Sequence, residues 1–383
     1  MATLRKWKLT ATHSIMVRTF QGVGSGMKRV LVIGAGRIGV AAAAMLARSR
    51  SYAVTLADQR PAARLPGGVA FQRLDAADPA KLDLICRGHA AVLSAAPFFL
   101  NAEIARAARD ANAHYFDLTE DVATTKAIRA LAEGAATAFV PQCGLAPGFV
   151  GIAASDLARR FDTVRAVKMR VGALPRYPHN RLKYNLTWST DGLINEYCNP
   201  CEALREGRLV SLQPLEGLER LVIDGVEYEA FNTSGGLGTL CESLAGRVDS
   251  LDYKTIRYPG HCEAMKLLLE DLGLNRKRGV LKEIFEDSLA ETPQDVVHVM
   301  VTASGLRDGR HVQETFTRTI FGLGPDDTAI QRTTAAGVCV VLDLVLNGRL
   351  EARGFVRQED VPLALFLANR FAGVYGEPIR AAA

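Results

Sequence analysis

The sequence predicts an α/β protein in which a doubly wound parallel sheet is interrupted by an inserted α+β domain built on a mostly antiparallel sheet. Three observations support this prediction. Between residues 28 and 145, short apolar runs alternate with helix-forming segments, a rhythm typical of parallel sheets with right-handed crossovers. Longer and more polar strand-like stretches follow, with hairpin signals at Asp224-Gly225 and Asp308-Gly309. From about residue 328 the helical pattern returns, so both ends of the chain are expected to complete one domain.

Each element is predicted from a local pattern. In the first part, residues 28–33 form an apolar, β-branched run and residues 40–48 an alanine-rich helix former. Further strands are expected over residues 52–57, 90–94, 114–118 and 138–141, with a helix over residues 101–112. The second part predicts strands over residues 164–171, 182–189, 219–231, 296–303 and 311–321, and helices over residues 259–271 and 277–285. The last part predicts helices over residues 329–346 and 361–371.

A glycine loop, Gly34-Ala35-Gly36-Arg37-Ile38-Gly39, lies between the first predicted strand and the first helix. In this pattern Gly34 permits the tight turn, Gly36 lets the backbone approach a pyrophosphate, and Gly39 lets the helix pack closely on the strand. The phosphates then lie at the positive end of the helix. Because an acidic residue follows about twenty positions later, the pattern predicts a Rossmann-type nicotinamide-dinucleotide site.

Two residues bear on which dinucleotide binds. Asp58, at the end of the second predicted strand, is placed to accept hydrogen bonds from the ribose hydroxyls, which favours NAD. Arg60 could instead pair with a 2′-phosphate, so NADP stays open. Small residues at Ala95-Ala96-Pro97, after the strand predicted over residues 90–94, are expected where the backbone passes the nicotinamide ribose.

Composition excludes several other classes of function. The net charge of +5 is scattered along 383 residues, which argues against a nucleic-acid partner. The longest apolar run, residues 337–342, is interrupted by Asp343 and is shorter than the roughly 18 residues of a membrane helix, so no membrane association is expected. Seven cysteines without a secretory signal indicate free thiols in the cytoplasm. The Cys198/Cys201 pair lacks a second pair, so we expect no metal.

These patterns divide the chain into three units. Residues 1–27, which include no acidic residue, are interpreted as a disordered extension or a presequence. Residues 28–145 form the predicted NAD(P)-binding domain, completed by residues 326–383. Residues 146–325 form the predicted substrate and dimerisation domain, whose exposed strands make a homodimer the expected oligomer.

Three segments resemble a known family: AHYFDLT at residues 113–119, GLAPGF at residues 144–149 and LTWSTDGLINEY at residues 186–197. By these motifs the chain resembles the saccharopine dehydrogenase-like family, and within it the lysine 6-dehydrogenases, over nearly everything after Met27. The resemblance implies an active site in a cleft between two domains and chemistry at a carbon-nitrogen bond of an amino acid. In saccharopine-forming relatives an arginine after the tryptophan-serine motif grips a carboxylate, whereas this chain has Asp191, which suits an amine. Ala146 also departs from the aspartate of many relatives, so the role of that position is not transferred.

Amine oxidation requires a base, and three residues are candidates. Asp117, at the carboxyl end of a parallel strand, is the first choice for proton transfer. Glu120 follows it, although it could simply begin a helix beside Asp121. His261 precedes a predicted helix and could be a second acid or base, or a structural histidine.

Six further residues are candidates for the substrate pocket. Cys143 could line it as a small thiol or be buried in the core. Arg181 and Lys183, which flank Tyr184, could hold an α-carboxylate or be solvated charges. Trp188 could form an apolar wall or belong to the core, and Asp191 could bind an α-ammonium.

The leading hypothesis is NAD-dependent oxidative deamination of an amino acid at a side-chain amine, with L-lysine oxidised at its 6-amino group to the semialdehyde. One alternative is reductive amination with NADP, as in saccharopine or carboxynorspermidine synthesis. A second alternative is a non-catalytic nicotinamide-binding regulator.

Overall fold

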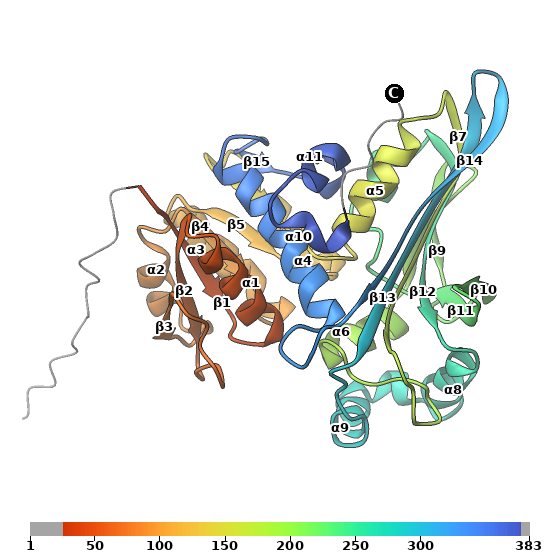
Figure 1. The fold of residues 1–383 in the computed structure, drawn as a ribbon, viewed down its shortest axis with the longest axis horizontal. Coiled ribbons are helices and arrows are strands. Elements are labelled where there is room, and N and C mark those ends of the chain that lie inside the picture. Colours follow the sequence, from red (N-terminus) through yellow and green to blue (C-terminus); the bar gives the residue numbers. More distant parts are fainter. Residues whose placement is uncertain (1–25, 377–383) are drawn as a thin grey trace, which may run out of the picture.

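The computed structural model describes residues 26–376 and contains two sheets, with most helices packed on or between them (Figure 1). Nearly all of the predicted N-terminal extension, and the last seven residues of the predicted cofactor domain, lie outside the described residues. The helices are α1 (Arg37–Arg48), α2 (Pro79–Cys86), α3 (Asn101–Asp110), α4 (Val122–Ala132), α5 (Phe149–Ala158), α6 (Thr190–Cys198), α7 (Leu240–Leu244), α8 (His261–Lys266), α9 (Arg278–Ser288), α10 (Ala329–Leu346) and α11 (Leu363–Leu367).

The first sheet is parallel throughout. In the described residues it has seven strands in the order β15-β6-β5-β4-β1-β2-β3. These are β1 (Lys28–Ile33), β2 (Tyr52–Asp58), β3 (Val69–Arg73), β4 (Ala91–Ser94), β5 (His114–Asp117), β6 (Ala138–Val140) and β15 (Gly354–Phe355). The period-two pattern of β1 explains the helices on both faces: Val30 and Val32 pack in the core that contains α1 and α10, while Leu31 and Ile33 pack with α2, α3 and α4. The predicted doubly wound parallel sheet is confirmed.

The second sheet is mixed. Among residues 26–376 it has eight strands in the order β10-β11-β12-β7-β13-β14, with the β8/β9 hairpin added beside β12. These are β7 (Thr163–Pro175), β8 (Cys201–Arg205), β9 (Arg208–Leu212), β10 (Glu219–Ile223), β11 (Val226–Asn232), β12 (Val248–Arg257), β13 (Asp295–Arg307) and β14 (Arg310–Phe321). Only β7 and β12 pair in parallel among these described strands, so the mostly antiparallel sheet is also confirmed.

Two local predictions for this sheet have different outcomes. Both Asp-Gly pairs form hairpin turns with positive φ at each residue, at Asp224-Gly225 and Asp308-Gly309, as two-residue turns of this type require. The strand predicted over residues 182–189 is wrong, because that segment is a loop with a single bridge from Leu186 to Glu291. Its apolar side chains pack on α6 and α9 instead.

Helix α10 is long and apolar enough to cross a membrane by length and composition, which the sequence expectation missed by treating Asp343 as an interruption. However, 89% of it is buried inside the described structure, between the two sheets (Figure 1). Asp343 is compatible with that burial because Tyr52, Asn369 and Arg370 all donate hydrogen bonds to its carboxylate, at 2.6, 2.8 and 2.5 Å. Its apolar composition is therefore that of a core helix.

Replacing Asp343 with alanine should destabilise the fold. The substitution leaves three donors around a buried position without their acceptor, and we expect the free energy of unfolding to fall by about 2 kcal/mol. Urea denaturation monitored by circular dichroism measures this change.

A matched control is Asp110→Ala, which removes an exposed partner of Arg106 and should change stability by less than about 0.5 kcal/mol. Equal stability of the Asp343→Ala variant and the unaltered protein would contradict a structural role for the buried carboxylate.

Candidate active site

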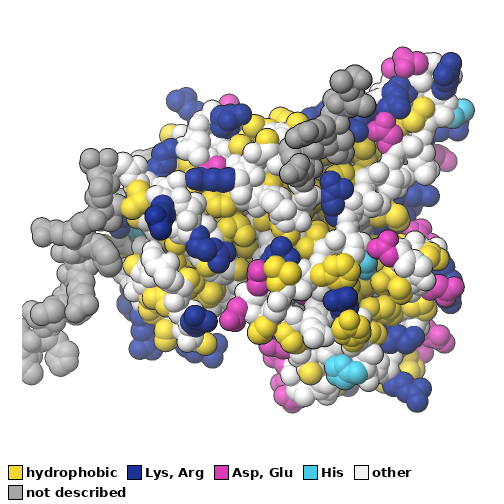
Figure 2. Space-filling model, viewed as in Figure 1, with side chains coloured by type: hydrophobic (Ala, Val, Ile, Leu, Met, Phe, Trp, Pro, Cys, Tyr) yellow, Lys and Arg dark blue, Asp and Glu magenta, His cyan; other side chains and the backbone are white. Residues whose placement is uncertain are grey.

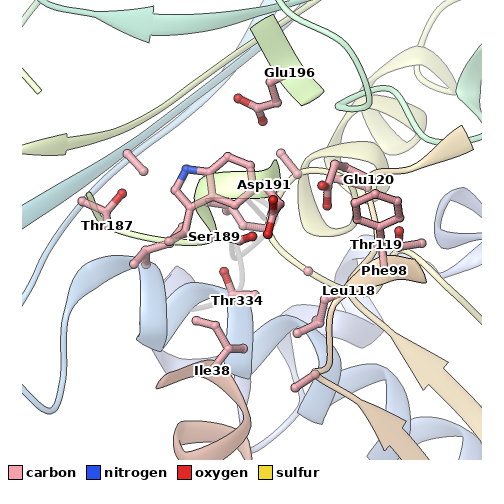
Figure 3. Close-up of a pocket in the computed structure, with 18 of the residues that line it drawn as sticks. Ile38, Phe98, Leu118, Thr119, Glu120, Thr187, Ser189, Asp191, Glu196 and Thr334 are labelled. Carbon is pink, nitrogen blue, oxygen red and sulfur yellow. The ribbon is translucent and has the colours of Figure 1, made fainter. Parts of the chain in front are cut away.

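A cavity of 460 Å³ lies where the carboxyl ends of the parallel strands meet the second sheet. Its lining comes from the glycine loop, the ends of β4, β5 and β6, the start of α10, and the loop, helix and strands of the second half (Figure 3). Sequence-predicted residues in this lining are Gly36, Arg37, Ile38, Ala95, Ala96, Pro97, Glu120, Trp188 and Asp191. Residues that the sequence analysis did not single out include Thr187, Glu196, Thr255, Arg257, Glu291 and Thr334.

The glycine loop has the geometry that a pyrophosphate requires. A Cβ on Gly34 would lie 2.5 Å from the carbonyl oxygen of Ala95, and one on Gly39 would lie 1.9 Å from that of Gly34. A Cβ on Gly36 would meet nothing within 4 Å, so the backbone there faces open space. Gly36 is also the N-cap of α1 and provides no capping side chain, which leaves the first N–H groups of the helix available to an anion. The loop therefore fits a dinucleotide.

Asp58 lies half-buried at the end of β2 and holds the loop in place. Its Oδ2 accepts a hydrogen bond from Ala35 N at 2.7 Å, and its Oδ1 accepts one from Arg60 N at 3.0 Å. Each oxygen keeps a second lone pair that can accept a ribose hydroxyl. The Arg60 side chain is exposed beside it, and neither residue lines the 460 Å³ cavity.

Asp117, the first choice for proton transfer, is fully buried and does not line the cavity. Its carboxylate accepts hydrogen bonds from the backbone N–H groups of Thr119 and Gln142, at 2.9 and 3.0 Å, and from the Tyr115 hydroxyl at 2.9 Å. Burial raises its pKa to about 6, and these three donors oppose the rise. The side chain thus connects the ends of β5 and β6 and has no access to a substrate.

Glu120 is the carboxyl group that faces the cavity from the parallel sheet (Figure 3). It is confined by two glycines of the second half of the chain: a Cβ on Gly192 would lie 2.9 Å from Glu120 Oε1, and a Cβ on Gly235 would lie 2.9 Å from Glu120 Cβ. Burial raises the pKa of Glu120 to about 7, and the nearby carboxylates of Asp121 and Asp117 add to the rise. A carboxyl group with this pKa can gain and lose a proton near neutral pH.

Arg257 and Glu196 face the same cavity from β12 and α6. Arg257 Nη2 and Glu196 Oε2 are 4.0 Å apart, and the two side chains are only 3% and 9% exposed. Burial raises the pKa of Glu196 to about 8, although the Arg257 guanidinium opposes this. The only sequence signal for either residue was that Glu196 belongs to the LTWSTDGLINEY segment.

His261 is buried outside the cavity, so the structure does not support it as an acid or base. Its Nδ1 is 2.7 Å from the Leu182 carbonyl oxygen and its Nε2 is 3.0 Å from the Tyr197 hydroxyl, which occupies both ring nitrogens. Burial, and then the nearby Arg257 guanidinium, lower its pKa to about 3. It remains a neutral structural histidine, the alternative that the sequence left open.

The structure places four predicted substrate residues away from the cavity. Arg181 and Lys183 are exposed, and Lys183 Nζ donates to the Pro259 carbonyl oxygen at 2.8 Å. Tyr184 is buried beneath Arg257, whose guanidinium lies 5.0 Å from the ring centroid. Cys143 is buried in the core.

Trp188 and Asp191 do line the cavity. Asp191 also forms an ion pair with Lys282, with 2.7 Å between Oδ2 and Nζ. Part of the negative charge that the sequence analysis assigned to substrate recognition is therefore already compensated within the protein. Across the cavity mouth, Arg37 of the glycine loop pairs with Glu291 of the second half.

Two sequence models of known domains match adjoining parts of the chain. The saccharopine dehydrogenase NADP binding domain matches residues 30–140, and the saccharopine dehydrogenase C-terminal domain matches residues 144–370. Among solved structures, the apo saccharopine dehydrogenase (L-Glu forming) from Saccharomyces cerevisiae is similar with a TM-score of 0.75 and 16% identity, over 88% of this chain and 96% of that one. It shares the fold. The DAP dehydrogenase of C. glutamicum gives a TM-score of 0.47 and 12% identity, over 90% of this chain and 97% of that one.

Gly36→Ala should weaken dinucleotide binding without weakening the fold. The new methyl group meets no protein atom but occupies the space through which a pyrophosphate reaches the backbone, so we expect NADH to bind about tenfold more weakly at an unchanged melting temperature. NADH fluorescence titration and differential scanning fluorimetry measure the two effects.

Gly39→Ala is the contrasting variant, since its methyl group would collide with the Gly34 carbonyl oxygen and should lower both binding and melting temperature. Unchanged NADH affinity in Gly36→Ala would show that the dinucleotide does not lie on this loop.

Proposed function

This chain belongs to the saccharopine dehydrogenase family, and on that premise we propose that it is an NAD-dependent dehydrogenase that oxidises the side-chain amine of an amino acid. The substrate that we propose is L-lysine, deaminated at its 6-amino group to the semialdehyde. The observation that carries the proposal is Glu120, a half-buried carboxyl group with a pKa of about 7 in the cavity next to the dinucleotide loop.

Glu120 supplies the base that amine oxidation needs. An alkylammonium has no lone pair to support departure of a hydride from its carbon, so a proton must leave first. The Glu120 carboxylate can accept that proton. Because Gly192 and Gly235 confine the side chain, the proton acceptor is held at one position in the cavity. A bound nicotinamide would supply the hydride acceptor, so that the ammonium substrate, NAD⁺ and water give the aldehyde, ammonium, NADH and one proton.

The charge of the cavity supports a cationic substrate. Its lining contains four acidic side chains and two basic ones: Glu120, Asp191, Glu196 and Glu291 against Arg37 and Arg257. Asp191 and Glu291 are already paired with Lys282 and Arg37, which leaves Glu120 and Glu196 against Arg257. In their carboxylate forms these two groups, together with Arg257, match the two ammonium groups and the one carboxylate of L-lysine. The indole of Trp188 offers an apolar surface for its methylene groups.

Reductive amination with NADP is the second candidate, and three observations favour it. The matching family domain is described as NADP binding, and the similar yeast structure is a saccharopine dehydrogenase. In this chain the exposed Arg60 lies two positions after Asp58, where it could pair with a 2′-phosphate.

Glu120→Gln should lower kcat for NADH formation from L-lysine by about 100-fold, because the amide cannot accept a proton. In the unaltered enzyme kcat should rise as pH increases through about 7, since only the carboxylate form of Glu120 is active, and this rise should be absent from the variant. Absorbance at the NADH band over a range of pH values, with saturating L-lysine, gives both results.

The control is Asp121→Asn, in which the neighbouring carboxylate, the N-cap of α4, is replaced by an equally good capping residue. It should retain the maximal rate and the rise with pH, with the midpoint moved only slightly to lower pH because the Asp121 charge adds to the raised pKa of Glu120. A Glu120→Gln enzyme with the kcat and pH profile of the unaltered protein would refute the assigned role, and no NADH from L-lysine in the unaltered protein would refute the proposed reaction.

Asp58→Asn should shift the cofactor preference. The amide oxygen can still accept the Ala35 N–H, while the negative charge that repels a 2′-phosphate is removed. We expect the unaltered protein to bind NADH more tightly than NADPH. In the variant, the ratio of the dissociation constant of NADPH to that of NADH should be about tenfold smaller. Tighter binding of NADPH to the unaltered protein would favour the reductive alternative.

A further inference from the structure

The end of the cavity that lies far from the glycine loop contains the guanidinium group of Arg257. Not all of the N–H donors of this group have a hydrogen-bond acceptor. Arg257 is 2% exposed, and its plane is fixed against the rings of Tyr184 and Tyr197, with centroids 5.0 and 5.7 Å from Cζ. Nε donates to the Tyr197 hydroxyl and Nη1 to the Ile256 carbonyl oxygen, each at 2.8 Å. Nη2 makes no hydrogen bond within residues 26–376. It therefore presents free donors at a rigid position that lines the cavity.

The Glu196 side chain, beside Arg257, has acceptor atoms that lack a hydrogen-bond donor. It is 7% exposed, and its backbone is held by the hydrogen bond from Ser234 N to the Glu196 carbonyl oxygen at 3.0 Å. In the described part of the chain its side chain accepts no hydrogen bond, and the nearest cation, Arg257 Nη2, is 4.0 Å from Oε2. That separation is longer than a direct hydrogen bond, so the guanidinium and the carboxyl group face each other without using their donors and acceptors.

A third polar group in the lining of the cavity also lacks a hydrogen-bond partner. Thr187 is 2% exposed and lines the cavity, and its Oγ1 has no hydrogen-bond partner among the described residues. Buried polar groups are normally satisfied, because an unmade hydrogen bond at such a position costs free energy. Three such groups around one cavity indicate a ligand that supplies both a negative and a positive end.

We propose that this end of the cavity is a subsite for the zwitterionic head group of an α-amino acid, with its carboxylate on Arg257 and Thr187 and its ammonium on Glu196. A simple carboxylic acid would leave Glu196 unpaired, and a simple amine would leave Arg257 unpaired. The inference deepens the proposed function and rests on it for the identity of the reacting amine.

The subsite also orients the substrate. In Figure 3, Glu196 lies at the opposite end of the cavity from Ile38 and Thr334, with Asp191 and Glu120 between them. A head group held at Glu196 is therefore kept away from the glycine-loop end, and the side chain extends toward Glu120. This arrangement directs oxidation to the carbon that bears the side-chain nitrogen and not to the α-carbon.

Three ligands test the subsite on the unaltered full-length protein by calorimetry. L-norleucine carries the complete head group, pentylamine lacks the carboxylate, hexanoate lacks the ammonium, and all three share the same butyl group. L-norleucine should bind at least about tenfold more tightly than either fragment. Norleucine affinity no greater than that of the fragments would overturn the proposal.

Two variants then assign the contacts. Arg257→Leu should reduce norleucine affinity to the level of pentylamine while pentylamine binding stays unchanged, and Glu196→Gln should reduce it to the level of hexanoate. If Arg257→Leu does not fold, Thr187→Val removes only the unpaired hydroxyl and should weaken norleucine and hexanoate about threefold without affecting pentylamine. Equal losses for all three ligands would point to a general distortion of the cavity and contradict the assignment.

Failure of this subsite can be told from failure of the proposed reaction. L-norleucine has no side-chain amine, so its binding does not depend on turnover. Head-group-dependent binding without NADH formation from L-lysine would refute the reaction alone. NADH formation with equal efficiency from L-lysine and cadaverine, which lacks the carboxylate, would refute the subsite alone.

Discussion

Helix α10 must bury nearly all of its surface against both sheets at once, and the position of the cavity depends on this constraint. At its start, the N–H groups of Ala329 and Ile330 donate to Asp295 at the beginning of β13, at 2.6 and 2.9 Å. Farther along, a Cβ on Gly337 would lie 2.5 Å from the Gly144 carbonyl oxygen, so only glycine permits the helix to approach the end of β6 this closely. The helix thereby fixes the second sheet relative to the first. Its first turns, through Ile330 and Thr334, form one wall of the cavity.

The two halves of the chain contribute different chemistry to that cavity. The parallel sheet supplies the glycine loop and Glu120, while the second half supplies Trp188, Glu196 and Arg257. Glu120 nevertheless depends on both halves, because it projects from the first and is confined by glycines of the second. The Arg37–Glu291 ion pair joins the halves at the cavity mouth. On the face drawn in Figure 2, basic, acidic and apolar side chains of the described residues are interspersed.

Local chemistry made much of the fold predictable from the sequence. The glycine loop, the strand-helix alternation and the Asp-Gly hairpins each depend on a few neighbouring residues, and all three lie where expected. The pairing of Glu196 with Arg257 could not be predicted, because it depends on how α6 packs on β12. Asp117 illustrates a different limit. The rule that strand ends face the ligand placed it at the correct edge of the sheet, but three donors turn its carboxylate into the protein, and Glu120 three positions later faces the cavity.

The proposed reaction is a nicotinamide-dependent oxidation that removes the side-chain amine of an α-amino acid whose head group is held at the far end of the cavity. The most direct measurement uses L-lysine labelled with ¹⁵N only at the 6-position, incubated with the full-length protein and NAD⁺, with products followed by NMR. We predict that ¹⁵N-ammonium appears in proportion to NADH. Unlabelled ammonium, or a label that remains in the organic product while NADH forms, would contradict the account.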